Sequence, residues 1–205
     1  MIKVVKDFLP KIIFKYILDI VEHEKFDWNW QSNTVYNPES YEFDGIGPKT
    51  GDGKFKLGKT IYTHPSLNPS GQGYGDNALM PLFGMFVELQ NQHQERRSEH
   101  LLKMKLNLYP NEGKHQHHGA HKDIIDRELR DDVVDQMVMT SVYNFHTCNG
   151  YTMIGDEKFP SIANQIVMFT PQAEHYGVTQ TDTPRRIILN MNVKLNVKLN
   201  EKTNK

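Results

Sequence analysis

The sequence is poor in cysteine, in long apolar runs and in net charge, and each shortage excludes a class of protein. Cys148 is the only cysteine among 205 residues, so an intrachain disulfide framework is excluded. No run approaches the ~20 consecutive apolar residues that a membrane-spanning helix needs. Lys+Arg 24 and Asp+Glu 25 nearly cancel to a formal net charge of -1, which disfavours nucleic acid and anionic membranes as partners.

The composition is that of an ordinary globular protein. Hydrophobic residues make up 38% and charged residues 24% of the chain, which is enough apolar material for a real core. We expect one domain over 1–205, with a helical and loop-rich N-terminal part over 1–100 and a core over 101–195. The first seven residues are mixed in charge and are not typical of a signal peptide, so a cytoplasmic location is expected.

Hydrophobic periodicity changes along the chain. Apolar residues recur at steps of three and four over 10–23 and 79–93, which predicts two helices. The stretch 37–75 is rich in Gly, Pro, Asn and Ser, which is typical of long binding loops. Strands are expected over 26–30, 59–62, 104–109, 137–145, 151–154, 165–169 and 186–195, with a hairpin turn at Cys148-Asn-Gly150. Helices followed by many short strands favour an all-β antiparallel sandwich with flanking helices.

Two histidines and one aspartate are spaced as metal ligands. His121 and Asp123 are two residues apart, so on an extended chain their side chains point to the same side. His175 follows an expected strand and a short turn, and it is a suitable third ligand. Two imidazoles and one carboxylate are the ligand set that holds non-haem iron(II) and leaves other positions open.

An arginine follows on the next expected strand. Arg186 lies 11 positions after His175, and alternation places it on one face with Ile188, Asn190 and Asn192. Arg185 falls on the opposite, apolar face. Because a guanidinium can bind a carboxylate through two parallel hydrogen bonds, Arg186 is the better candidate for a carboxylate clamp. An open iron site beside such a clamp suggests oxygen chemistry driven by a 2-oxo acid.

Neighbouring histidines compete with this assignment, whereas motifs for other chemistries are missing. The segment Lys114-His-Gln-His-His-Gly-Ala120 leaves open whether His115, His117 or His118 contributes to the site. His121 is preferred because neither His117 nor His118 has a carboxylate two residues later. The sequence contains no Gly-x-Ser-x-Gly motif and no phosphate-binding loop.

The ordered set of His121, Asp123, His175 and Arg186 resembles the iron(II)/2-oxoglutarate-dependent oxygenases, over roughly 101–193. The upstream Asn107-Leu-Tyr109 also resembles a feature of this family. Its subfamily with prolyl-4-hydroxylase-like domains is suggested by Ser141-Val-Tyr-Asn144, Asn149-Gly-Tyr-Thr152 and Asn164-Gln165. The resemblance implies a double-stranded β-helix, that is, a cupin-like jelly roll. It implies Fe(II) on His121, Asp123 and His175, and 2-oxoglutarate on Arg186, Tyr109 and Asn107. O2 is the second co-substrate, ascorbate is a candidate further requirement, and no catalytic residue is implied beyond the metal site.

The resemblance also implies an activity. It would be the hydroxylation of an unactivated C–H bond with release of succinate and CO2. A protein or peptide side chain such as proline is the preferred substrate, with a small molecule as the other option. One alternative is a non-catalytic metal-binding jelly-roll protein, which should close its metal with four ligands. A metal hydrolase is a third, but it leaves Arg186 unexplained. The sequence does not indicate an oligomeric state.

Overall fold

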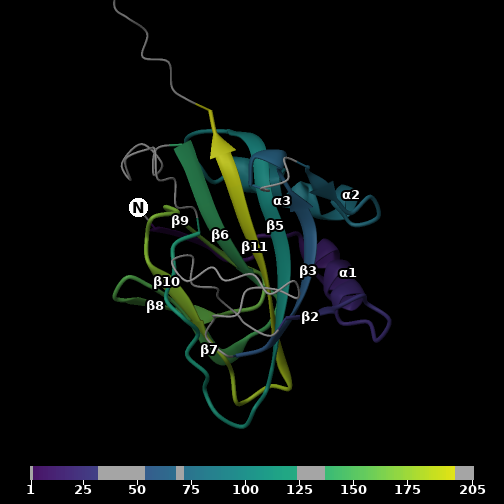
Figure 1. The fold of residues 1–205 in the computed structure, drawn as a ribbon, viewed down its shortest axis with the longest axis vertical. Coiled ribbons are helices and arrows are strands. Elements are labelled where there is room, and N and C mark those ends of the chain that lie inside the picture. Colours follow the sequence, from purple (N-terminus) through teal and green to yellow (C-terminus); the bar gives the residue numbers. More distant parts are fainter. Residues whose placement is uncertain (1, 32–53, 68–71, 124–136, 197–205) are drawn as a thin grey trace, which may run out of the picture.

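The structure is a computed structural model, and it describes residues 2–31, 54–67, 72–123 and 137–196. Its main element is an eight-stranded antiparallel sheet with the strand order β1-β9-β6-β11-β5-β3-β2, and β4 pairs with β3 (Figure 1). A second sheet has the order β10-β7-β8. The strands of the large sheet are β1 (Ile2–Val5), β2 (Asn29–Gln31), β3 (Lys56–Thr63), β4 (Tyr74–Gly75), β5 (Ser98–Pro110), β6 (Val138–Asn144), β9 (Gln165–Phe169) and β11 (Arg185–Leu195). Those of the small sheet are β7 (Cys148–Ile154), β8 (Glu157–Ser161) and β10 (His175–Val178).

Short helices cover one face of the large sheet. They are α1 (Lys11–Val21), α2 (Met80–Phe83) and α3 (Met85–Asn91), and the 3-10 turn η2 (Pro65–Leu67) lies between α1 and α2 in the sequence. Pro10 precedes α1, where its missing N–H is tolerated, and Ile17 and Val21 of this helix are fully buried. Gly84 separates α2 from α3, in keeping with the low helix propensity of glycine.

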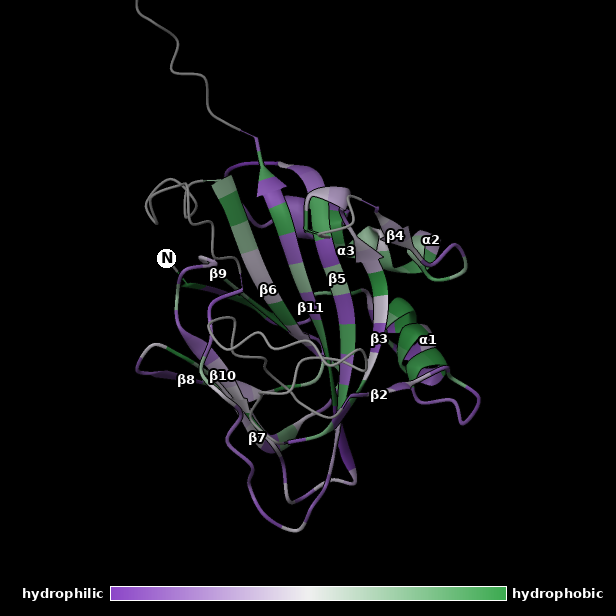
Figure 2. Ribbon diagram, in the orientation of Figure 1, coloured by the Kyte–Doolittle hydropathy of each residue, from purple (hydrophilic) through white to green (hydrophobic). Residues whose placement is uncertain are grey.

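The two faces of the large sheet carry different residues. On β5, Met104, Leu106 and Leu108 pack with the helices in the main hydrophobic core. The opposite face is turned toward the small sheet, and we call it the inner face. A smaller apolar cluster fills part of the space there, formed by Tyr109, Val142, Ile154, Val167, Phe169 and Ile188. Figure 2 shows the resulting alternation of hydrophilic and hydrophobic residues along β5 and β11.

The register places a polar set on the inner face. Because strands alternate, β5 contributes Lys105, Asn107 and Tyr109, and β11 contributes Arg186, Asn190 and Asn192. Lys105 lies opposite Asn190, and Tyr109 lies opposite Arg186. β3 adds Lys56, Gly58 and Thr60 to this face, since Gly58 pairs with Asn107 and Thr60 with Lys105.

The predicted all-β fold is confirmed: the chain is an antiparallel jelly roll with flanking helices. The helix expected over 10–23 is α1, and the one expected over 79–93 is split at Gly84. The strand expected over 26–30 is only the three-residue β2. Much of the loop region 37–75 lies outside the described residues. No helix in the described part of the chain has the length and apolar character needed to cross a membrane.

The hairpin turn predicted at Cys148-Asn-Gly150 is wrong. These residues form the start of β7, and the tight turn comes later at Gly155, whose φ is +55°. Gly150 is required for packing, because an added Cβ would lie 3.0 Å from the Val178 carbonyl oxygen and 3.1 Å from Cδ of Arg186. This glycine therefore makes room for the arginine side chain.

Candidate metal centre

Backbone pairing brings the two histidines together. His121 lies in an extended segment beside β10, where its N–H donates to the His175 carbonyl at 3.0 Å and the His175 N–H donates back at 3.0 Å. Residues paired in this way in an antiparallel bridge project to the same side. Their rings accordingly lie with centroids 4.4 Å apart. Asp123 follows two residues later, and its N–H donates to the Pro171 carbonyl at 3.3 Å.

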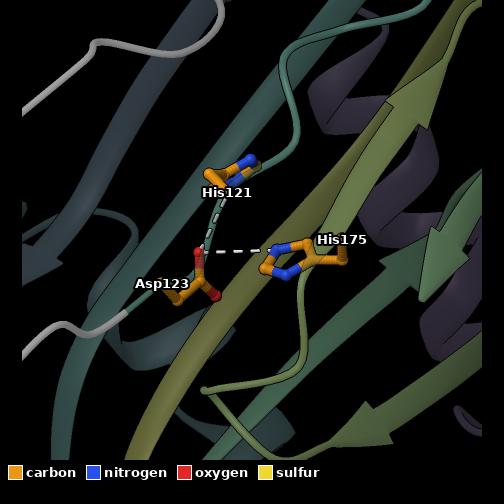
Figure 3. Close-up of side chains that lie close together, drawn as sticks. All are labelled: His121, Asp123 and His175. Carbon is orange, nitrogen blue, oxygen red and sulfur yellow. Dashed lines mark ion pairs between the residues drawn. The ribbon is translucent and has the colours of Figure 1, made fainter. Parts of the chain in front are cut away.

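The three side chains converge on one point. The Nε2 atoms of His121 and His175 lie 3.7 Å and 3.6 Å from the same oxygen, Oδ1 of Asp123 (Figure 3). One ligand atom from each residue falls within 4.8 Å of the others, which is a spacing that a single ion can bridge. Among the described residues no fourth His, Cys, Asp or Glu joins this group. The side chain of His121 is 31% exposed and that of His175 only 4%, so the site is open on the His121 side.

Carbonyl groups set the tautomer of both imidazoles. Nδ1 of His121 lies 3.1 Å from the Gly119 carbonyl, and Nδ1 of His175 lies 3.0 Å from the Ala173 carbonyl. Because a carbonyl can only accept, each Nδ1 must carry the proton in the neutral ring. The Nε2 lone pairs then face Asp123, as is typical of metal-binding histidines whose second nitrogen is held by the protein.

Asn192 holds the aspartate. Its Nδ2 donates to Oδ2 of Asp123 at 2.9 Å and to Oγ1 of Thr140 at 2.9 Å. This contact leaves Oδ1 directed at the histidines. Burial alone would raise the pKa of Asp123, but hydrogen bonds from His175 and Asn192 and the charges of both histidines hold that pKa well below its usual range. The carboxylate is therefore ionised, which is the form that binds a cation.

The two histidines differ in their protonation. Burial and the nearby His175 lower the pKa of His121, which favours its neutral form. Burial also opposes charge on His175, but its hydrogen bond to Asp123 and the charge of that carboxylate outweigh burial and raise the pKa. A cation bound between the rings would replace the proton that His175 otherwise shares with Asp123.

Arg186 lies on the inner face and is completely buried. Its Nε donates to Ser161, one terminal nitrogen donates to the carbonyls of Tyr151 and Val178, and the other donates to Asn144 and Thr152, over distances of 3.0–3.3 Å. All five N–H groups thus have neutral acceptors. No carboxylate pairs with Arg186 within the described parts of the chain, so its charge has no local anion.

The other predicted residues lie near this arginine. Tyr109 is 5% exposed and its ring is 4.6 Å from that of His118, which is also buried. Asn107 is 1% exposed, and its Oδ1 has no hydrogen-bond partner in the described structure. His115 contacts the Thr179 carbonyl through Nδ1, and His117 is bridged to Val178, so neither belongs to the three-residue group.

Several residues of the site are not identified as functional by the sequence alone. The alternation along its strand places Asn192 on the polar face, but no sequence pattern links it to Asp123. Lys105 and Lys56 also lie on the inner face, and alternation with Asn107 and Tyr109 was the available signal for Lys105. The ring of acceptors around Arg186 comes from β6, β7, β8 and β10, so no local pattern could have revealed it.

Comparison with known proteins gives a clear result for structure only. No protein-family model matches the sequence, and no curated protein matches it. An oxidoreductase of the 2OG-Fe(II) oxygenase family from Burkholderia pseudomallei is similar at a TM-score of 0.58 and 8% identity, covering 94% of this chain and 85% of that one. A Trichoplax adhaerens prolyl hydroxylase, in complex with a peptide fragment of the hypoxia inducible factor oxygen degradation domain, is similar at 0.57 and 11%, covering 94% and 83%. A Pseudomonas putida prolyl-4-hydroxylase is similar at 0.51 and 12%, covering 96% and 92%. The chain therefore has the fold of these oxygenases.

Proposed function

We propose that the chain is an Fe(II)- and 2-oxoglutarate-dependent dioxygenase that hydroxylates an unactivated C–H bond. The observation that carries the proposal is the convergence of two Nε2 atoms on Oδ1 of Asp123, with each Nδ1 occupied by a carbonyl. Three protein ligands on one side of a metal leave positions for a co-substrate and for O2. The shared fold with oxygenases supports the proposal.

Each residue of the site would have a separate role in this reaction. His121, Asp123 and His175 would hold the iron, and Asn192 would orient the aspartate. Arg186 would supply the charge for the distal carboxylate of 2-oxoglutarate, with Tyr109 and Asn107 beside it. The bound groups supply oxidative decarboxylation of 2-oxoglutarate to succinate and CO2, coupled to hydroxylation of the substrate.

The positive charge of Arg186 would favour a carboxylate ligand. Its N–H donors, however, are already engaged by neutral acceptors. A buried guanidinium without an anion is costly, so a carboxylate would be attracted to it. It would compete with Asn144 and Thr152 for the donors that now serve these two side chains. Oδ1 of Asn107, which has no hydrogen-bond partner among the described residues, lies on the same face. A ligand that enters beside Arg186 would also change the surroundings of this atom.

The engaged donors of Arg186 also support a second function, a non-catalytic jelly-roll protein that binds a metal without 2-oxoglutarate. Calorimetric titration separates the two: the first function requires metal-dependent binding of 2-oxoglutarate, whereas the second requires a tightly bound metal and no such binding. Succinate formation and O2 uptake with Fe(II) and ascorbate then test the activity. Asp123→Ala and His121→Ala should abolish it, and full activity in both would refute the ligand assignment.

Arg186 has a matched control beside it. Arg186→Ala should weaken 2-oxoglutarate binding roughly tenfold to a hundredfold, as expected for a lost charged hydrogen bond of about 1.5–3 kcal/mol. Arg185 is on the opposite face and binds Glu22 at 3.1 Å, so Arg185→Ala should leave that affinity unchanged. Equal effects of the two substitutions would contradict the assigned clamp.

For the substrate we propose a protein or peptide side chain, with proline as the first candidate. The support is the likeness to the Trichoplax prolyl hydroxylase, which was solved with a peptide. We further propose that residues 1–205 act as one domain, because β1, β2 and β3 from the first hundred residues extend the sheet that contains β5 and β11. Hydroxylation of a prolyl peptide, followed by mass spectrometry, tests the substrate.

A further inference from the structure

A lysine lies on the inner face near the candidate metal centre. Lys105 is paired across the strands with Asn190, which is two residues from the aspartate-holding Asn192 on the same face of β11. Lys56 is 8% exposed on the neighbouring β3, and its charge lowers the pKa of both Lys105 and His121. The charge of Lys56 thus acts both on Lys105 and on one of the candidate metal ligands.

The amine of Lys105 is positioned by a neutral group. Its Nζ donates to Oε1 of Gln31 at 2.9 Å, and in the described parts of the chain no carboxylate forms an ion pair with it. Gln31 in turn lies over Gly58, where an added Cβ would be 2.6 Å from its Nε2. The glycine thus lets Gln31 lie against the sheet and hold the lysine amine.

Polar atoms adjoin this amine, and a cavity begins at its partner Gln31. The cavity has a volume of about 390 Å³ and is lined by Gln31 with Asn29, Gly58, Lys59, Thr60 and Tyr74, but not by Lys105 itself. Asn107 lies two residues from Lys105 on β5, and Asn190 lies directly opposite it on β11. Oδ1 of each is buried without a hydrogen-bond partner in the described structure. Buried polar atoms are usually satisfied, and both of these are acceptors, so they point to a ligand that donates hydrogen bonds in addition to the group it presents to Lys105.

The charges of the proposed reaction are balanced without Lys105. The two positive charges of iron(II) and the one of Arg186 match the single negative charge of Asp123 and the two of 2-oxoglutarate. The lysine is then a surplus cation in a partly buried site, where a charge is costly unless it is paired. Burial and the charges of Lys56 and Lys103 lower the pKa of Lys105 to about 7, and a bound anion would restore its full charge.

We propose that Lys105, supported by Lys56, binds a carboxylate of the substrate, so that the hydroxylated molecule is an acid. This inference rests on the proposed function. The carboxylate can belong to a small acid or to an acidic residue of a peptide, since a lysine amine recognises either as a point charge.

The test uses binding to the Mn(II)-loaded protein saturated with 2-oxoglutarate, followed by calorimetry. Matched pairs differ only in one charge: L-proline and L-prolinamide, L-glutamate and L-glutamine, and the peptides Ala-Pro-Asp-Ala and Ala-Pro-Asn-Ala. We expect at least one acid to bind tenfold or more tightly than its amide partner. The free acids and the peptides distinguish the two sources of the carboxylate.

Variants connect this preference to the lysine. Lys105→Met should remove the preference for the acid and Lys105→Arg should restore part of it, whereas Gln31→Leu, which keeps the charge, should reduce it only a few-fold. Lys15→Met removes the same charge from the exposed side of α1 and should leave the preference intact. Equal binding of acids and amides, or an acid preference that survives in Lys105→Met, overturns the inference.

Failure of the proposed function would be recognised separately. Binding of 2-oxoglutarate to the metal-loaded wild type is measured first, and its absence counts against the dioxygenase and not against the lysine. Lys105→Met should bind metal and 2-oxoglutarate with wild-type affinity. A loss of 2-oxoglutarate binding in this variant would assign Lys105 to the co-substrate and overturn the inference.

Discussion

Replacing Lys105 with methionine should stabilise the protein, and the gain should depend on pH. The pKa of Lys105 is lowered from 10.5 to about 7, first by burial and then by the charges of Lys56 and Lys103. Each pKa unit corresponds to about 1.36 kcal/mol, which sets a ceiling of about 5 kcal/mol on the cost of the charged form. Methionine has a similar volume and no charge, so Lys105→Met should recover a large part of this cost.

The sign of the pH dependence follows from linkage. Between pH 7 and pH 10.5 the unfolded chain holds a proton on Lys105 that the folded chain lacks, so wild-type stability rises with pH in this window. Below pH 7 both states are protonated and the cost is fully present. The advantage of Lys105→Met should therefore be largest near pH 6 and should shrink toward zero by pH 10.5.

Urea denaturation at several pH values measures this difference. The slope of wild-type stability should exceed that of the variant by up to about 1.36 kcal/mol per pH unit in the window. Lys15→Met, on the exposed side of α1, should change stability by less than about 0.5 kcal/mol at every pH. A gain that is the same at pH 6 and pH 10, or a loss at pH 6, would refute the reasoning.

Three further substitutions test other contacts. Asn192→Ala should weaken metal binding about 10–100-fold in a calorimetric titration, because it frees Oδ2 of Asp123, and an unchanged affinity would contradict this role. Gly150→Ala should lower the free energy of unfolding by about 1–3 kcal/mol in urea, whereas Gly75→Ala, whose Cβ would make an ordinary 3.7 Å contact, is the near-neutral control. Burial would raise the pKa of Glu22, but hydrogen bonds from His146 and Arg185 outweigh it and lower this pKa. The ionised carboxylate therefore stabilises the folded state at pH 7, and this contribution is lost as the pH falls below 4.5. Glu22→Gln should therefore cost up to about 1 kcal/mol at pH 7 and flatten the acid side of the stability curve.

The fold class and the three-residue group could be predicted because each depends on local spacing. The period of the apolar residues changes from helical to alternating, and the spacing of His121 and Asp123 places both side chains on one side of an extended chain. His175 could be added because it begins the strand after a turn. The structure brings these three residues together as the spacing suggested.

What could not be predicted depends on contacts between distant strands. Asn149-Gly150 has the composition of a turn. The glycine is needed, however, because the side chain of Arg186, 36 positions later, leaves no room for a Cβ. The partners of that arginine come from four strands, so its buried state has no sequence signature. Lys105 looks like a solvent-facing residue of an alternating strand until the second sheet is known to lie over the same face.

The two neighbouring arginines show how the hydrophobic core on the helix side of the sheet determines the site on the inner face. Arg185 binds Glu22 near the end of α1, and Arg186 points inward, so a shift of β11 by one residue would exchange them and turn Asn192 away from Asp123. Ile187, Leu189, Met191 and Val193 oppose such a shift because all four are at most 1% exposed on the helix side. At about 1.5–3 kcal/mol for each buried side chain, exposing this row would cost roughly 6–12 kcal/mol. The register that positions Asn192 beside the candidate ligands is thus maintained by apolar residues that never touch the site, and substitutions among them should disturb metal binding as well as stability.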